Sequence, residues 1–394
     1  MEISEFGTKI KNNLWYYIKD FLYYQRVADS PVIQNLNFNF DPNQKKAVMC
    51  YLTSSYFINW ETKKIDRMQP LEIMKIVNIL SGLGYCVDVI GCNDIKALEV
   101  IKKKKYDLIF GFGETFYQLT SLYPDATSIL YVTENHPEFS YKEEKKRLDY
   151  YHERYGRRIK MSRSGKYYKT YHLQKKYSYV ITMSDNKLYN NHIINKYHIF
   201  PIGLTNNNYV FENKNHLLSR KQFLWLGSTG AIHKGLDLLL NIFIKQNDIV
   251  LHICGFNKYE RKYLKLPNKN NIIDHGHIDI NSEIFLNLNK LCSYIILPSC
   301  SEGFSTSITT GMIHGLIPVV MRDTGFNKLG EIAVFFEDYK LDYLHVKINE
   351  LANMDPEKLT ILSRQSYDFA RQHFTIPAYG QNFTKIMDDI LRKK

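Results

Sequence analysis

Short apolar runs alternate with segments of helical periodicity along most of this chain, and that alternation limits its fold more than any other feature. Strands that alternate with helices form parallel sheets covered by helices. The first stretch runs from Ala47 to Ile202, and the second begins at Phe223. In the second we predict six strands, at 223–226, 249–254, 272–275, 294–297, 317–321 and 334–336, with helices beginning near Gly235, Lys258, Asn281, Thr306 and Asn327. The pattern predicts an α/β protein with two similar layers.

An Asn-rich connector that starts at Asn206 separates the two stretches. Asn disfavours both helix interiors and strands, so a domain boundary is expected there. We predict an N-terminal domain over 1–203, a linker over 204–220 and a C-terminal domain over 221–375. A final amphipathic helix within 376–394 is expected to return to the first domain. The aromatic leader at 14–24 is expected to dock on that domain as a helix, with an interfacial membrane helix as the alternative.

Composition excludes several classes of protein. Hydrophobic residues make up 44% of the chain and aromatic residues 14%, which excludes disorder over most of its length. Apolar runs are too short for a membrane span and the start is acidic, so we expect a cytoplasmic protein. The 6 cysteines form no Cys-x-x-Cys pair and the 13 histidines no His-Glu-x-x-His motif. Buried thiols are therefore expected, and no metal or other cofactor.

Positive charge is concentrated in one segment, 142–176, with 13 Lys or Arg against 4 Asp or Glu. Interleaved tyrosines suit this segment to anionic lipid or to a phosphorylated acceptor. The alternative is a solvated basic helix and loop without a partner. Nucleic acid is the least favoured partner, because no recognised nucleic-acid module accompanies the charge.

The segment 297–320 carries the most specific chemistry. A buried strand ends at Leu297, Glu302 and Gly303 form a turn, and a helix opens at the hydroxyl residues Ser305, Thr306 and Ser307. Amides at such a helix start bind an anion such as a diphosphate. Glu302 would repel phosphate and so is expected to accept hydrogen bonds from hydroxyls on the group that the phosphate carries. Together these features describe a sugar nucleotide site.

This segment resembles the signature of the retaining glycosyltransferases of family four, which have the GT-B fold. The match covers Glu302-Gly303-Phe304, Met312, Gly315 and Pro318-Val319-Val320. The family's second Glu is replaced by Thr310. The resemblance implies that Glu302 contacts the donor sugar, and that Thr310 or a neighbour takes the ribose contact.

Two further segments of the second stretch are similar to that family. In 226–237, Lys234 matches the lysine that binds the donor diphosphate, while Ser228 and Thr229 stand where the family has an arginine. Neutral hydroxyls there predict weaker phosphate binding than a bidentate Arg would give. The strand and loop at 271–278 resemble the segment that brackets the nucleotide base, which implies His277 and Ile278 as base contacts.

Two residues of the first stretch complete the predicted site. The resemblance implies that His136, in the loop after the strand at 128–132, lies near the transferred sugar. Glu114 is the acceptor-side candidate, and its alternative is an acid that caps the helix starting at Thr115.

The resemblance implies two Rossmann-like domains facing each other across a cleft. It also implies a metal-independent, retaining hexosyltransferase that takes a nucleotide-diphosphate sugar. The expected acceptor is a glycan or lipid-linked molecule in surface polysaccharide biosynthesis, with peripheral contact to the inner face of the cell membrane. Two alternatives remain: a sugar-nucleotide epimerase of the same fold, and a non-catalytic protein that binds sugar nucleotides.

Overall fold

The computed structural model describes residues 32–39, 41–53, 68–163, 173, 177–185, 195–205, 209–322 and 324–393. The leader at 14–24 and residues 164–172 and 174–176 of the basic segment lie outside these ranges. Contacts divide the described chain into two compact units. One contains residues up to Leu130 apart from Met68, and the other contains Met68 and Tyr131 onward. This division lies elsewhere than the linker expected at 204–220, and the domain boundaries stay a prediction.

The first sheet has seven strands in the order β1-β3-β2-β4-β5-β6-β7. Strand β1 is antiparallel to β3, whereas β2 pairs in parallel with β3 and β4, β4 with β5, and β6 with β7. The strands are β1 (Ile33–Leu36), β2 (Lys46–Tyr51), β3 (Cys86–Gly91), β4 (Leu108–Gly111), β5 (Thr127–Val132), β6 (Tyr179–Thr182) and β7 (Lys196–His198). The helices between the first five strands are α2 (Met68–Gly82), α3 (Ile95–Ile101) and α4 (Gly113–Leu122).

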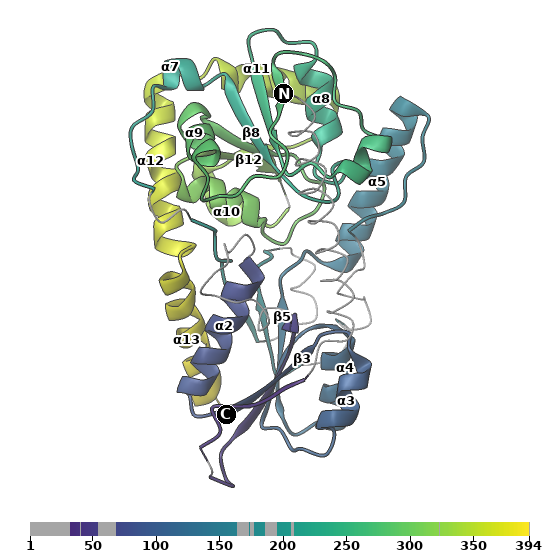
Figure 1. Cartoon of the computed structure of the whole chain (residues 1–394), viewed down its shortest axis with the longest axis vertical. Helices are drawn as coiled ribbons and strands as arrows, with labels where there is room; N and C mark the ends of the chain where they lie inside the picture. Colours follow the sequence, from purple (N-terminus) through teal and green to yellow (C-terminus); the bar gives the residue numbers. More distant parts are fainter. Residues whose placement is uncertain are drawn as a thin grey trace, which may run out of the picture. The chain divides into compact units, whose positions relative to one another are not determined.

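The second sheet has six strands, all parallel, in the order β10-β9-β8-β11-β12-β13, as Figure 1 shows in part. This is the doubly wound order, which reverses between β8 and β11. All six strands expected in this stretch are present. They are β8 (Gln222–Leu226), β9 (Val250–Cys254), β10 (Ile272–Asp274), β11 (Tyr294–Leu297), β12 (Ile317–Met321) and β13 (Val334–Phe336).

The helices of the second unit match the expectations less completely. Those expected near Lys258 and Asn327 are short 3-10 helices, and Gly330, at φ 53°, interrupts the second of them. The connector ends in a single turn at α7 (His216–Ser219). The two 3-10 helices are η3 (Lys258–Lys262) and η4 (Asn327–Ile332), and the α-helices after β8 are α8 (Leu236–Phe243), α9 (Glu283–Leu291), α10 (Thr306–Ile313), α11 (Leu341–Ala352), α12 (Pro356–His373) and α13 (Ile376–Arg392).

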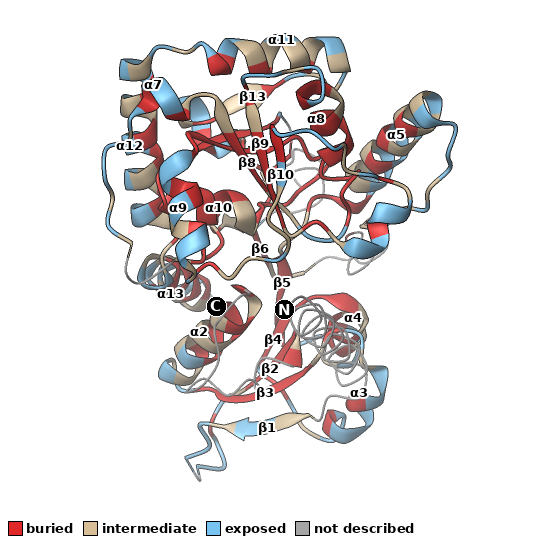
Figure 2. Ribbon diagram, turned by 45° about the horizontal axis from the view of Figure 1, so that its top comes forward, coloured by how far each residue is buried: buried red, intermediate tan, exposed pale blue. Residues whose placement is uncertain are grey.

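The core of the second unit is the sheet itself. Figure 2 shows its strands buried, while the helices around them expose their outer faces. Phe223 and Tyr294 stack on neighbouring strands with ring centroids 4.7 Å apart. All six cysteines of the chain are buried, as expected. Among the described helices, none is both long and apolar enough to cross a bilayer.

The long helix α5 (Pro137–Tyr155) begins with Pro137 at its first position and ends at Gly156, whose φ of 66° makes it a left-handed C-cap. Arg147 on α5 and Asp237 at the start of α8 are both fully buried, with 2.5 Å between Nη2 and Oδ1. Arg154 pairs with the other oxygen of Asp237. Two guanidinium groups thus attach α5 to the second sheet's first helix.

The last helix, α13, packs against strands of the first sheet that belong to the second unit. Its Tyr379 hydroxyl lies 3.0 Å from that of Tyr131 at the end of β5. Tyr197 of β7 donates to Asp389 of the same helix.

Asp237→Ala should lower the free energy of unfolding by about 3–5 kcal/mol, because it leaves the buried Arg147 without its carboxylate. Chemical denaturation measures the change. The matched control is Asp248→Ala, which breaks an exposed pair with Lys221 and should cost less than about 1 kcal/mol. Equal costs for the two variants would contradict this account of α5.

Candidate functional site

The loops that follow β8 and β11 lie side by side, at the point where the strand order of the second sheet reverses. The Cys300 amide donates to the His233 carbonyl oxygen over 2.9 Å. A Cβ on Gly235 would lie 2.4 Å from the Pro298 carbonyl oxygen, so only glycine permits this approach. Carboxyl ends of parallel strands at such a reversal are the usual ligand site of open α/β sheets.

Lys234 and Glu302, predicted separately from two loops, form an ion pair here. Nζ of Lys234 donates to Oε1 of Glu302 over 2.5 Å, and the Ser299 hydroxyl donates to the same oxygen over 2.9 Å. Lys234 is 5% exposed and Glu302 9% exposed. Burial alone would raise the pKa of Glu302, but the charges of Lys234, Arg163 and His233 lower it to about 2. The carboxylate is therefore ionised at neutral pH.

The loop after β5 packs against the loop that carries Glu302. A Cβ on Gly303 would lie 2.3 Å from the Thr133 carbonyl oxygen, so the two backbones touch. Ser140 and Ser301 are joined by a hydrogen bond of 2.7 Å between their hydroxyls. His136 belongs to this first loop: it is buried and is the N-cap residue of α5. The structure thus brings the backbone around His136 to the Glu302 loop.

Helix α5 adds a second buried acid, Glu144, which the sequence does not single out. Its Oε1 accepts from the Ser162 amide at 2.8 Å and from the Arg163 amide at 3.2 Å. The same oxygen lies 3.7 Å from Nδ1 of His233. Glu144 is 1% exposed, whereas most cations in the described part of the basic segment are exposed.

His233 links this acid to the Glu302 loop. Its Nε2 lies 2.6 Å from the Ser301 carbonyl oxygen, which can only accept, so Nε2 carries a proton. Burial lowers the pKa of His233, but Cys300 and the carboxylates of Glu144 and Glu302 raise it to about 10. His233 is therefore an imidazolium at neutral pH.

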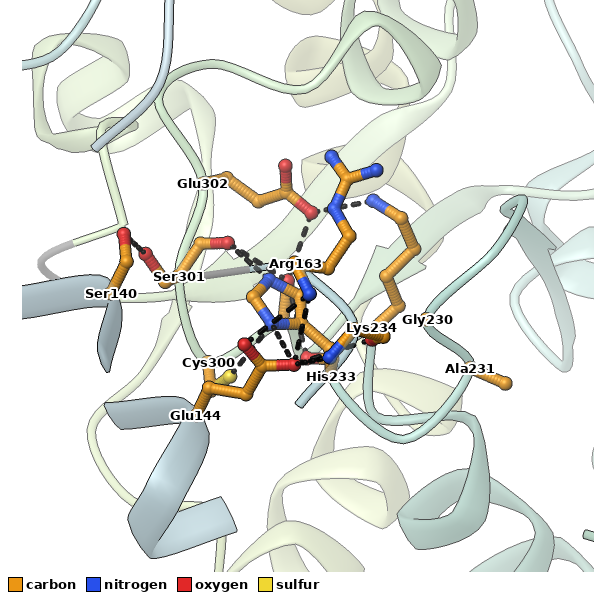
Figure 3. A network of polar contacts seen from close by, with 12 residues as sticks. Ser140, Glu144, Arg163, Gly230, Ala231, His233, Lys234, Cys300, Ser301 and Glu302 are labelled. Carbon is orange, nitrogen blue, oxygen red and sulfur yellow. Dashed lines mark hydrogen bonds and ion pairs between the residues drawn. The ribbon is translucent and has the colours of Figure 1, made fainter. Parts of the chain in front are cut away.

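Arg163, like Glu144 and His233, is a site residue that the sequence analysis does not identify. Figure 3 shows its guanidinium beside the Glu302 carboxylate and the Lys234 ammonium. Arg163 comes from the basic segment, where it is one of 13 cations with nothing in the pattern to distinguish it. Only the docking of α5 on α8 places it here.

The remaining predicted phosphate contacts lie in two places, the loop after β8 and the start of α10. Ser228 and Thr229 are exposed, and Asn257 donates to the Thr229 hydroxyl over 3.2 Å. The next amides along the chain, of Gly230 and Ala231, donate to the buried Glu260 carboxylate at 3.0 Å. At the start of α10, the Ser305 and Ser307 hydroxyls bond each other at 2.8 Å and Thr306 is the first helical residue.

The predicted nucleotide and acceptor contacts come from helix α10, the loop after β10 and helix α4. Thr310 is 1% exposed, and its hydroxyl accepts from the Leu204 amide at 3.1 Å. His277 is exposed and Ile278 half-buried in the loop after β10. Glu114 belongs to the other compact unit, in the first turn of α4, where Gln118 donates to its Oε1 over 3.0 Å. Their roles stay predictions.

Within the described ranges, no group of three or more His, Cys, Asp or Glu side chains is arranged to hold a metal ion.

Comparison with known proteins bears on the same part of the chain. Residues 211–368 match the family described as Glycosyl transferases group 1. That stretch contains the whole second sheet and with it Lys234 and Glu302. No curated protein matches the chain.

Solved structures match over a greater length. The chain is similar to a sucrose-phosphate synthase from Thermosynechococcus elongatus, with a TM-score of 0.60 and 12% identity over 89% of this chain and 100% of that one. It is also similar to HepE of Anabaena in complex with UDP and glucose (0.56; 14% identity; 88% and 100%). A third is the pneumococcal O-GlcNAc transferase GtfA with UDP and GlcNAc (0.51; 15%; 77% and 61%). At these identities the likeness shows the fold alone, and it confirms the predicted α/β, GT-B class with two Rossmann-like domains.

The His233 imidazolium predicts a loss of stability at alkaline pH. Its pKa is raised from 6.5 to about 10 in the folded protein, so its contribution is complete below pH 6.5 and disappears as pH rises through 10. Between pH 7 and 10, the free energy of unfolding should therefore fall more for the wild type than for His233→Gln. The expected difference is on the order of a few kcal/mol, because each unit of pKa shift corresponds to about 1.4 kcal/mol. Denaturation at each pH measures this, and a wild-type-to-variant difference that stays constant with pH would contradict it.

Proposed function

We propose that this chain is a retaining glycosyltransferase that moves a hexose from a nucleotide-diphosphate sugar to a glycan or lipid-linked acceptor without a metal ion. The observation that carries the proposal is the buried Lys234–Glu302 pair at the reversal point of the second sheet. The family match over 211–368 supports the transferase class. UDP in the HepE and GtfA complexes supports a nucleotide-diphosphate donor.

Donor binding would exchange the partners of this ion pair. The Lys234 ammonium has three donors and moves to the diphosphate, which carries more negative charge than one carboxylate. Amides and hydroxyls at the start of α10, from Ser305 to Ser307, add neutral donors where the helix dipole favours an anion. Released from Lys234, Glu302 accepts hydrogen bonds from the sugar hydroxyls.

Transfer with retention then needs two kinds of electrostatic help. The departing diphosphate gains negative charge, which Lys234 and the α10 N-terminus stabilise most in the transition state. The sugar becomes positively charged in character, and the ionised Glu302 beside it stabilises that charge. The acceptor hydroxyl gives its proton to a phosphate oxygen of the donor. His136, in the loop that packs on Gly303, holds a sugar hydroxyl.

The proposal also covers the contacts to the acceptor and the nucleotide, and the place in the cell where the protein works. We propose Glu114 on the acceptor side, His277 and Ile278 at the base and Thr310 near the ribose. The acceptor belongs to surface polysaccharide biosynthesis, and the protein works in the cytoplasm at the inner face of the cell membrane. The concentration of cations in 142–176 supports an anionic partner there.

Glu302→Gln should lower kcat by at least about 100-fold, because an uncharged amide neither stabilises the developing positive charge nor holds the same hydroxyls. Mass spectrometry of product formed from a panel of sugar nucleotides and lipid-linked or glycan acceptors measures it. Glu337→Gln, the same substitution at an exposed pair with Arg322 in this unit, is the matched control and should retain activity.

Full activity in folded Glu302→Gln would overturn the site assignment. Incubation without any acceptor separates the epimerase alternative, because an epimerase converts the free sugar nucleotide. The non-catalytic alternative predicts donor binding without turnover for every acceptor.

A further inference from the structure

The loop after β8 provides a single permanent cation for a phosphate. Between Gly227 and Gly235 the only Lys or Arg is Lys234. A diphosphate carries at least two negative charges, and a lysine is a point charge without the fork that binds two phosphate oxygens at once. A second cation from another element would complete such a site.

Arg163 lies where that cation is needed. A Cβ built on Gly230 would lie 3.2 Å from its Cγ and 3.3 Å from its Cδ, so the side chain crosses the loop after β8 in van der Waals contact. Its guanidinium lies beside the Lys234 ammonium and the Glu302 carboxylate (Figure 3). The absence of a side chain at Gly230 makes room for this crossing.

The backbone of Arg163 is fixed by buried groups. The amides of Ser162 and Arg163 donate to Glu144, at 2.8 Å and 3.2 Å. Glu144 sits on α5, which Arg147 attaches to Asp237 at the start of α8. The loop after β8 leads directly into α8, so Arg163 and Lys234 are anchored to the same helix.

The charges of this cluster favour an added anion. Lys234, Arg163 and His233 surround the Glu302 carboxylate and lower its pKa, so three basic side chains gather around this acid. Lys234, His233, Glu302 and Glu144 are all at least nine-tenths buried. Two permanent cations, Lys234 and Arg163, thus lie beside a single carboxylate, and a bound diphosphate would give both of them a further partner.

We infer that Arg163 is the second diphosphate-binding residue of the donor site and acts beside Lys234. Glu144 is a positioning residue that acts through the backbone of Arg163. The guanidinium binds two phosphate oxygens in parallel, which compensates for the neutral Ser228 and Thr229 in the loop after β8. This inference rests on the proposed function and adds a residue to the same site.

Isothermal titration of the full chain with UDP, GDP, ADP, CDP and dTDP first identifies the nucleoside diphosphate that binds. Arg163→Ala should then weaken binding of that diphosphate by about 10- to 100-fold, the loss of a charge-assisted hydrogen bond. The matching nucleoside monophosphate should lose much less affinity. Arg163→Lys should fall between the wild type and Arg163→Ala.

Arg158→Ala is the matched control, since Arg158 is an exposed cation of the same segment and its loss should leave diphosphate affinity within about twofold. Thermal unfolding of each variant confirms that it is folded. Unchanged or tighter diphosphate binding by Arg163→Ala, or equal losses for diphosphate and monophosphate, would overturn the inference while leaving the proposed function intact. If the wild type binds none of the diphosphates, the proposed function fails and the inference fails with it.

Discussion

The buried ion pair between Lys234 and Glu302 is the interaction on which this site depends. Removing two charges from water costs several kcal/mol for each, so such a pair persists only where surrounding groups satisfy both partners. The Ser299 hydroxyl, His233 and Arg163 stabilise the Glu302 carboxylate from three different segments. Each of these groups also fixes the loop that carries it, so the loops around the reversal point of the second sheet hold one another in place. The same pair leaves a carboxylate ready for hydroxyls once an anion takes over its lysine.

Helix α5 connects this site to the basic segment of the chain. Its two buried contacts, Glu144 to the 162–163 loop and Arg147 to Asp237, connect the basic segment to the second sheet. The basic segment, whose composition suits contact with an anionic surface, therefore also contributes to the interior of the site. The exposed cations of α5 are partly neutralised by neighbouring acids, as in the pair of Lys145 with Asp149. Cations of one segment thus have two kinds of surroundings: Arg147 is buried against Asp237, whereas Lys145 is exposed beside Asp149.

The sequence predicts the second sheet well because its strands are short runs of buried apolar residues between polar loops. Glu302 and Lys234 are also predictable, because each lies in the loop between such a strand and the next helix. The helices predicted near Lys258 and Asn327 are only 3-10 helices, at 258–262 and 327–332. Each is too short, or too interrupted, for regular α-helical turns. Arg163 and Glu144 could not be predicted. Arg163 lies 71 positions from Lys234 and 139 from Glu302, and Glu144 lies 89 positions from His233, so only the docking of α5 brings them together.

The central claim is that Lys234 leaves Glu302 to bind a donor diphosphate. A crystal structure of the protein with the bound nucleoside diphosphate tests it most directly. The account predicts phosphate oxygens within hydrogen-bonding distance of the Lys234 ammonium and the Arg163 guanidinium, and a Glu302 carboxylate that has lost its 2.5 Å contact with Lys234. A diphosphate bound elsewhere, with that contact intact, would contradict it.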